Sequence, residues 1–206
     1  KREKASGPQP IADILAKTTE KIDQLYHQDG SMTGVASGFS DFDKMTSGLQ
    51  PADLIIMAGR PSMGKTVLGV NIAEHVAITA KKPVCIFSLE MPNDAIVMRM
   101  LASLGRIKLP RVRTGKLHDD DWPRMTSAIG MLAQAPIFID DTPGISPSDM
   151  RSKVRQLARA HGDLGLILVD YLQLMRVPEI KDNRVQEISE ISRSLKMIAK
   201  EFNVPV

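Results

Sequence analysis

The sequence has little cysteine, few aromatic residues and no long apolar run. The single cysteine, Cys85, excludes an internal disulfide and favours a reducing compartment. No apolar run approaches the length that crosses a bilayer, and no signal peptide opens the chain. These absences predict a cytoplasmic protein with no membrane partner. Neither sign of charge dominates: the net charge is only +3, which by itself points to no particular partner.

What the chain does have is the composition of an ordinary globular protein. Hydrophobic residues make up 43% and charged residues 25% of 206 residues, which suits one α/β core with a short appended segment. A glycine-rich stretch, GRPSMGKT at residues 59–66, fits the phosphate-loop pattern G-x-x-x-x-G-K-[ST]. An apolar run at 54–58 precedes it and a helix-like run follows, which is the context that the pattern requires.

Each residue type in this loop has a chemical reason. Gly59 and Gly64 permit unusual backbone torsions and leave room for a phosphate against the loop amides. Lys65 reaches the β- and γ-phosphates, and the Thr66 hydroxyl joins a Mg²⁺ shell. The predicted nucleotide-contacting residues are Gly59, Arg60, Pro61, Ser62, Met63, Gly64, Lys65, Thr66 and Val67.

Strand-like and helix-like runs alternate after the loop. Strands are expected at 54–58, 84–89, 137–140 and 166–170, and helices at 67–80, 93–105, 119–133, 146–161 and 184–202, with turns at 38–54 and a loop after 105. This alternation predicts a mostly parallel sheet with helices on both faces. Runs such as GLILVD are apolar without alternation, as strands buried on both sides are.

Carboxylates that follow predicted strands are candidates for metal and water chemistry, because ligands bind at the carboxyl edge of a parallel sheet. Asp170 follows the longest apolar run and is the first candidate for the Mg²⁺ site, with Asp140 and Asp141 as alternatives. Glu90 follows the second strand and is the candidate that orients water toward the γ-phosphate. A helix N-cap or a solvated loop is the competing interpretation of each acid.

Basic residues gather in three places: residues 106–116, the helix with Arg151, Lys153, Arg155 and Arg159, and the segment 176–184. The helix is interpreted as a solvated face. The segment 176–184 differs because it is a polar loop at the ligand edge, where Arg176, Lys181 and Arg184 are predicted to grip the phosphates of a bound strand. No aromatic residues are interleaved with them, so base stacking is not indicated.

The N-terminal part has the pattern of a linker that carries one amphipathic helix. Residues 11–27 place Ile11, Ile14, Leu15, Thr18, Ile22 and Leu25 at helical spacing, and glycine- and serine-containing stretches flank them. We expect residues 1–36 to form an interdomain linker whose apolar stripe docks on a neighbouring subunit, and residues 37–206 to form the core domain.

Several motifs in this order resemble those of a known family. SGLQPADLIIMAGRPSMGKT, FSLEMP, RTGKL, LILVDYLQLMR, NRVQEISEISRSLK and KEFNVPV are similar to the ATPase domain of bacterial replicative DNA helicases of the DnaB type. The resemblance implies a RecA-like P-loop NTPase core that forms a homo-hexamer, moves along single-stranded DNA and hydrolyses ATP with Mg²⁺. It also implies primase and a helicase loader as partners.

By position, the resemblance implies Lys65 and Glu90 as catalytic residues and Thr66 and Asp170 as the metal site, with the first DNA loop near 175–184. The family's γ-phosphate-sensing glutamine, its other DNA loop and its arginine finger would lie beyond Val206. We therefore expect the 206-residue chain alone to have low activity, since an arginine finger contributes orders of magnitude to the rate.

Three other functions fit parts of the sequence. A RadA- or RecA-like recombination ATPase shares the core but not the linker helix or the SLEM motif. A partner-docking fragment with an idle phosphate loop would use the helix at 11–27. A small-molecule kinase is disfavoured because no lid-like arginine cluster is evident.

Overall fold

The structure is a computed structural model that describes residues 8, 10–27, 32–60, 62–178, 180 and 183–206. Its elements, in chain order, are α1 (Ile11–Tyr26), α2 (Ser40–Thr46), α3 (Lys65–Thr79), β1 (Val84–Ser88), α4 (Asn93–Leu104), α5 (Leu109–Thr114), α6 (Asp121–Gln134), β2 (Ile137–Asp140), α7 (Pro147–His161), β3 (Leu166–Asp170), a 3₁₀ turn η1 (Leu172–Leu174) and α8 (Arg184–Phe202). The alternation of strands and helices gives an α/β fold, as the sequence predicts.

The three strands form a parallel sheet in the order β2-β1-β3. Phe87 of the central strand lies opposite Asp140, and Ser88 lies opposite Asp170. All three strands therefore end at one edge of the sheet. This edge is where a parallel α/β sheet binds its ligands.

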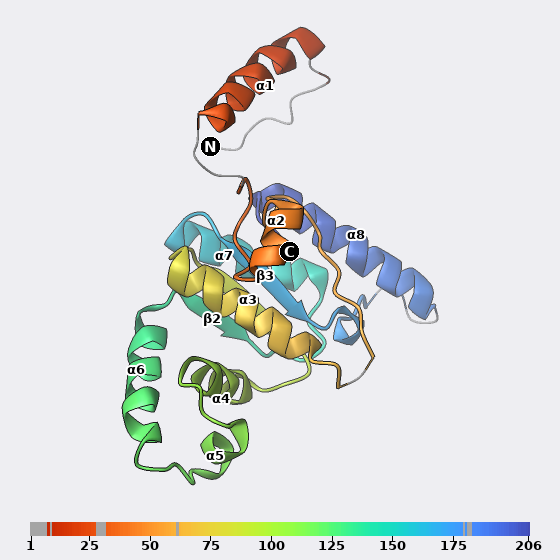
Figure 1. The fold of residues 1–206 in the computed structure, drawn as a ribbon. Coiled ribbons are helices and arrows are strands. Elements are labelled where there is room, and N and C mark those ends of the chain that lie inside the picture. Colours follow the sequence, from red (N-terminus) through yellow and green to blue (C-terminus); the bar gives the residue numbers. More distant parts are fainter. Residues whose placement is uncertain (1–7, 9, 28–31, 61, 179, 181–182) are drawn as a thin grey trace.

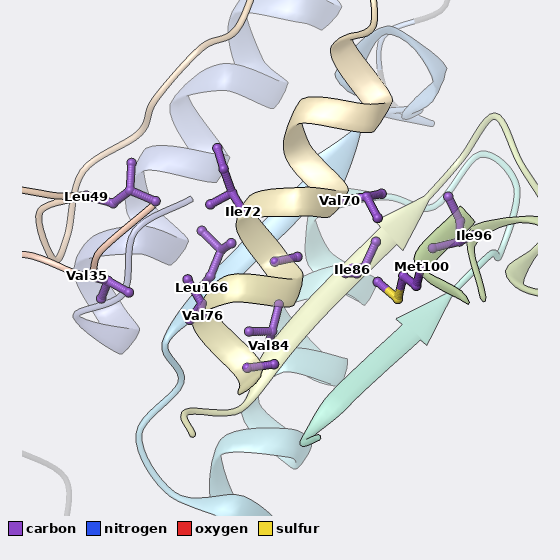
Figure 2. Close-up of a cluster of buried hydrophobic side chains, with 12 residues drawn as sticks. Val35, Leu49, Val70, Ile72, Val76, Val84, Ile86, Ile96, Met100 and Leu166 are labelled. Carbon is purple, nitrogen blue, oxygen red and sulfur yellow. The ribbon is translucent and has the colours of Figure 1, made fainter. Parts of the chain in front are cut away.

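Helices cover both faces of the sheet (Figure 1), and the side chains of β1 alternate between the two faces. Val84 and Ile86 pack with residues of α3 and α4, in the cluster that Figure 2 shows. Their neighbours Cys85 and Phe87 face the opposite side, against α7 and α8. β1 is buried along its whole length, which explains why its sequence is apolar without alternation.

The expected strand at 54–58 does not form as a strand. Among the described residues, Val206 bonds to the start of this stretch and to the residue before it: Val206 N–H donates to Asp53 O at 2.9 Å, and Ile55 N–H donates to Val206 O at 2.8 Å. Ile167 N–H of β3 donates to Pro205 O at 3.0 Å, so the 204–206 segment lies between β3 and this stretch. A strand needs a continuous partner, and here the described chain pairs only its first residues.

Two short helices occur where turns or loop were expected. α2 forms within 38–54, where Asp43 accepts hydrogen bonds from Ser37 N–H at 2.9 Å and from Gly38 N–H at 3.2 Å. α5 forms within the loop after residue 105, with a proline in its first turn. Helices as short as these carry too little periodicity to be distinguished from turns by sequence alone.

α1 forms as predicted, and the described residues of this chain leave its apolar stripe uncovered. Ile11 is 73% exposed and Ile22 is 61% exposed, and Figure 1 shows the helix apart from the sheet and its covering helices. Apolar side chains on a helix are normally buried against another surface. In the described part of the chain, none of the helices combines the length and the apolar character needed to span a bilayer.

Candidate nucleotide site

The phosphate loop runs directly into α3, with Gly64 as the residue before the helix. Gly64 has φ +85°, a left-handed conformation that favours glycine. Lys65 opens the helix, and its Nζ donates a hydrogen bond to Gly59 O at 3.0 Å. A Cβ at Gly59 would lie 3.4 Å from Lys65 Cγ, so the lysine stem rests against this glycine. Pro61 lies outside the described residues.

The start of α3 has the character of an anion site. Within the described residues the helix has no side-chain cap and no acidic residue in its first turn, so its first amides are not bonded by a capping side chain. Lys65 places a positive charge at this end, where the helix dipole disfavours a cation. A bound phosphate would satisfy the amides and would neutralise both positive charges.

Close packing fixes α3, the helix that follows the loop, against β3. Gly69 lies so near the strand that a Cβ there would be 2.9 Å from Leu168 Cδ1. Lys65 Nζ lies 5.8 Å from the centre of the Tyr171 ring, and Tyr171 follows Asp170 directly. Lys65 therefore faces the same strand end as the predicted metal-site acid.

Asp170 is buried, at 8% exposure, and its Oδ2 atom has no hydrogen-bond partner among the described residues. A buried carboxylate oxygen without a partner is costly unless a cation or donor approaches it. The donor set of a carboxylate and the half-buried Thr66 hydroxyl suits Mg²⁺, which prefers hard oxygen ligands. The residues present thus fit the metal that the sequence predicts.

The two alternative acids already have partners. Asp140 accepts a hydrogen bond from Lys153 Nζ at 2.5 Å, and Asp141 accepts one from Asn93 N–H at 3.0 Å. Burial acts to raise the pKa of Asp140, but the bonds from Lys153 and Thr142 outweigh it and hold this pKa below its usual value. Asp140 and Asp141 therefore already bond to other parts of the fold, whereas Asp170 Oδ2 has no hydrogen-bond partner among the described residues.

Glu90 lies on the turn that follows β1 and is exposed. Leu89 N–H donates to Asp170 O at 2.7 Å, and Ser88 Oγ donates to Met91 O at 2.6 Å. These bonds place Glu90 at the sheet edge that holds Asp170. Across the part of the chain that the structure describes, no group of three or more histidine, cysteine or acidic residues suits a metal ion elsewhere.

The predicted DNA segment begins at the same edge and is anchored by a buried acid, Glu187. Glu187 is 4% exposed, and its Oε1 accepts from Val177 N–H at 2.9 Å. Its Oε2 pairs with Arg184, which also donates to Gln173 O. The Val177 bond, opposed by burial and aided by Arg184, lowers the pKa of Glu187.

The two described arginines of this segment are therefore not equivalent. Arg176 is 68% exposed and lies 3.8 Å from Glu187 Oε2, whereas Arg184 is held by Glu187 and Gln173. Lys181 lies outside the described residues. On the basic face of α7, Arg151 and Arg155 both pair with Glu201.

Tyr171 and Glu187 are two site residues that the sequence patterns did not single out. The sequence contains a clue to each: Tyr171 follows the acid that is predicted to bind metal, and Glu187 stands three residues after Arg184 on a helix, a spacing that brings opposite charges together. Asn183 and Gln186 mark the start of the same helix, where Asn183 Oδ1 accepts from Gln186 N–H at 3.1 Å.

A glycine loop before a helix, a buried acid on a neighbouring strand and a parallel sheet between helices define a P-loop nucleotide-binding fold of the RecA-like type. The family model of the DnaB-like helicase C terminal domain matches residues 34–206. The chain belongs to this family.

Relatives and solved structures agree with the family match. The chain is 51% identical to the replicative DNA helicase DnaB of Haemophilus influenzae, over 98% of this chain and 44% of that protein. It is 50% identical to the replicative DNA helicase DnaC of Bacillus subtilis, over 100% of this chain and 45% of that protein. The chain thus spans about half the length of the curated relatives that it matches.

Among solved structures, one described as an ATPase domain superposes with a TM-score of 0.88 at 33% identity, over 96% of this chain and 69% of that one. A DnaB-like replicative helicase, described with its interactions with primase, superposes with a TM-score of 0.85 at 33% identity, over 97% of this chain and 47% of that one. Both neighbours support the RecA-like assignment.

Proposed function

We propose that this chain is the ATP-hydrolysing motor of a replicative DNA helicase. The single observation that carries the proposal is the buried Asp170, whose Oδ2 has no partner among the described residues, at the sheet edge that Lys65 faces. A nucleotide and its metal ion would satisfy both groups, since an unpaired buried carboxylate oxygen and an uncapped helix start each reduce stability when left alone.

The chain's own groups divide the work. The amides at the start of α3 and the Lys65 ammonium hold the phosphates of ATP, and the residues 59–67 wrap them. Thr66 and Asp170 hold Mg²⁺, which supplies charge neutralisation at the phosphates when bound. Glu90, on the exposed turn beside Asp170, orients the attacking water and accepts its proton.

DNA contact belongs to the loop that continues from β3. We assign direct phosphate contact to Arg176, because its side chain is exposed. Arg184 holds the loop in place through Glu187 instead. Lys181 is a further candidate from the sequence. Phosphate contacts of this kind give affinity without base specificity, as a motor that moves along any sequence requires.

The exposed stripe of α1 supports a ring of identical subunits. Residues 1–36 act as an interdomain linker in this proposal, and α1 docks on the residue 37–206 domain of a neighbour. Replacing Ile22 by Asp is expected to shift the assembly toward smaller species in sedimentation, whereas Lys21→Asp keeps it intact. An unchanged hexamer for Ile22→Asp contradicts this part. Primase and a loader are the proposed further partners, and the cytoplasm is the proposed location.

Family membership separates the chain from recombination ATPases and small-molecule kinases. A partner-docking domain with an idle phosphate loop remains the second candidate, supported by the exposed stripe of α1. The two differ in whether ATP matters. If the chain is a docking domain, the Lys65→Ala variant binds its partner as tightly as the wild type does. If it is a motor, Lys65→Ala abolishes its ATP-driven activity.

Unwinding of a forked duplex by the protein in its natural full length tests the proposal. We expect ATP-dependent strand separation and ATP hydrolysis that single-stranded DNA stimulates, both abolished by Lys65→Ala. Lys82→Ala, a lysine outside the loop, serves as the matched control and is expected to unwind normally. Strand separation that persists in Lys65→Ala contradicts the proposal, and so does the absence of any DNA-stimulated hydrolysis.

A further inference from the structure

The turn that carries Glu90 is tied down at both ends. At the strand end, Leu89 N–H donates to Asp170 O at 2.7 Å and Ser88 Oγ closes the turn onto Met91 O at 2.6 Å. Ser88 is 1% exposed, so this end is fixed inside the fold. The exposed carboxylate of Glu90 depends on these ties for its position.

The helix end of the turn is held from a different strand. α4 begins at Asn93, and its preceding residue, Pro92, gives no side-chain cap. The cap comes from Asp141, 48 residues away, whose Oδ2 accepts from Asn93 N–H at 3.0 Å. β2 ends at Asp140 opposite Phe87 of β1, so Asp141 stands beside the end of the central strand.

We propose that Asp141 is a positioning residue for Glu90. It fixes the start of α4, and with it the far end of the turn of residues 89–92, so that Glu90 is presented to the reacting water in one orientation. A carboxylate that accepts from a helix's first amides stabilises that end by bond and by charge. This inference rests on the proposed role of Glu90, and it gives a use to an acid that does not bind the metal.

The expected loss of rate in an Asp141 variant follows from how steeply hydrolysis depends on the position of the reacting groups. A misplacement of about 1 Å costs on the order of a hundredfold in rate. Asp141 provides one of the ties on the turn, so its loss is expected to lower kcat about tenfold. Binding of ATP depends on residues 59–67 instead, so the KM for ATP and the nucleotide Kd are expected to stay unchanged.

The test compares Asp141→Ala with Asp141→Asn in the protein at its natural full length. Asparagine keeps the oxygen acceptor and removes the charge. We expect Asp141→Ala to lose about tenfold in kcat at constant KM, with faster amide exchange at Asn93, and Asp141→Asn to recover most of the rate. Asp149→Ala, which removes an acid from the start of α7, is the matched control and is expected to leave the rate unchanged.

Each other outcome has a distinct meaning. If Glu90→Ala abolishes hydrolysis while Asp141→Ala keeps the normal kcat, the positioning role is wrong and the proposed function stands. If Asp141→Asn is as slow as Asp141→Ala, the rate depends on the negative charge of Asp141 and not on its hydrogen bond to Asn93 N–H. That result also overturns the inference. If Glu90→Ala hydrolyses ATP normally, the proposed role of Glu90 fails and the positioning role fails with it.

Discussion

At the scale of single residues, Glu74 is the side chain whose environment suits its charge least. It lies on α3 with 5% exposure, and Ser103 Oγ donates to its Oε2 at 3.1 Å while Oε1 has no partner among the described residues. Burial raises the pKa of Glu74 to about 7, partly opposed by the Ser103 bond. The phosphate-loop helix therefore contains an acid that is easily protonated.

This raised pKa predicts a pH-dependent stability. Between pH 4.5 and 7 the unfolded state releases the Glu74 proton before the folded state does, so the free energy of unfolding falls as pH rises and levels off above pH 7. The total is about 3 to 4 kcal/mol at most for a shift from 4.5 to about 7. Glu74→Gln removes this loss and keeps an acceptor for Ser103.

Urea unfolding at about pH 5 and about pH 8, on either side of the raised pKa, measures the effect. Glu74→Gln is expected to be more stable than the wild type at the higher pH, with a difference that shrinks toward the lower one. Glu20→Gln, on the exposed face of α1, is the control and is expected to show no such change. A Glu74→Gln variant that is equally destabilised at both pH values contradicts the burial argument.

Residue-level prediction succeeds where chemistry is local in sequence. The start of α7 is an example: Ser146 and Asp149 have the spacing of a capping box, and Asp149 N–H donates to Ser146 Oγ at 3.1 Å. The roles of Asp141 and Glu187 are not local. Asp141 meets Asn93 from another strand, and sequence spacing gives no measure of such a contact.

At the scale of elements, the charged residues at the segment between β3 and α8 have two different environments: some hold the segment in place, and one is exposed to solvent. Glu187, on the first turn of α8, bonds to Val177 and Arg184 and so fixes both ends of the loop. Arg176 remains largely exposed. Because Glu187 bonds to Val177 beside it, Arg176 is presented at a constant place, which lowers the entropy lost when a strand binds.

This division predicts different effects for the two arginines. Arg176→Ala is expected to lower the slope of log K against log salt for single-stranded DNA by about 0.7 for each subunit in contact, because one phosphate contact is lost. Arg184→Ala is expected to leave the slope unchanged and to speed proteolysis of the loop. Equal slopes for Arg176→Ala and the wild type contradict the assignment. Arg193→Ala, an exposed arginine farther along α8, is the control.

Elements that bury a continuous apolar stripe were predicted well, and elements that depend on a neighbour were not. The helices predicted at 93–105 and 184–202 form as α4 and α8, and each buries apolar side chains in the core. The 54–58 stretch has the composition of a strand, yet only its start is paired within the described chain. Strand formation depends on partners that composition does not reveal.

At the scale of the whole molecule, the order β2-β1-β3 explains why distant residues work together. The residues Glu90, Asp141 and Asp170 come from three different strand ends, and the parallel arrangement brings all three to one edge. The sequence predicted this edge because alternation of strands and helices implies parallel strands. It did not predict the order of the strands.

The most direct test of the proposed motor measures nucleotide binding and hydrolysis separately in one preparation of the full-length protein. Lys65→Ala is expected to lose binding of ATP with Mg²⁺. Glu90→Gln is expected to bind ATP as tightly as the wild type and to hydrolyse it at least about a hundredfold more slowly, which is the range for loss of a general base. Wild-type hydrolysis by Glu90→Gln, or wild-type binding by Lys65→Ala, contradicts the proposed motor.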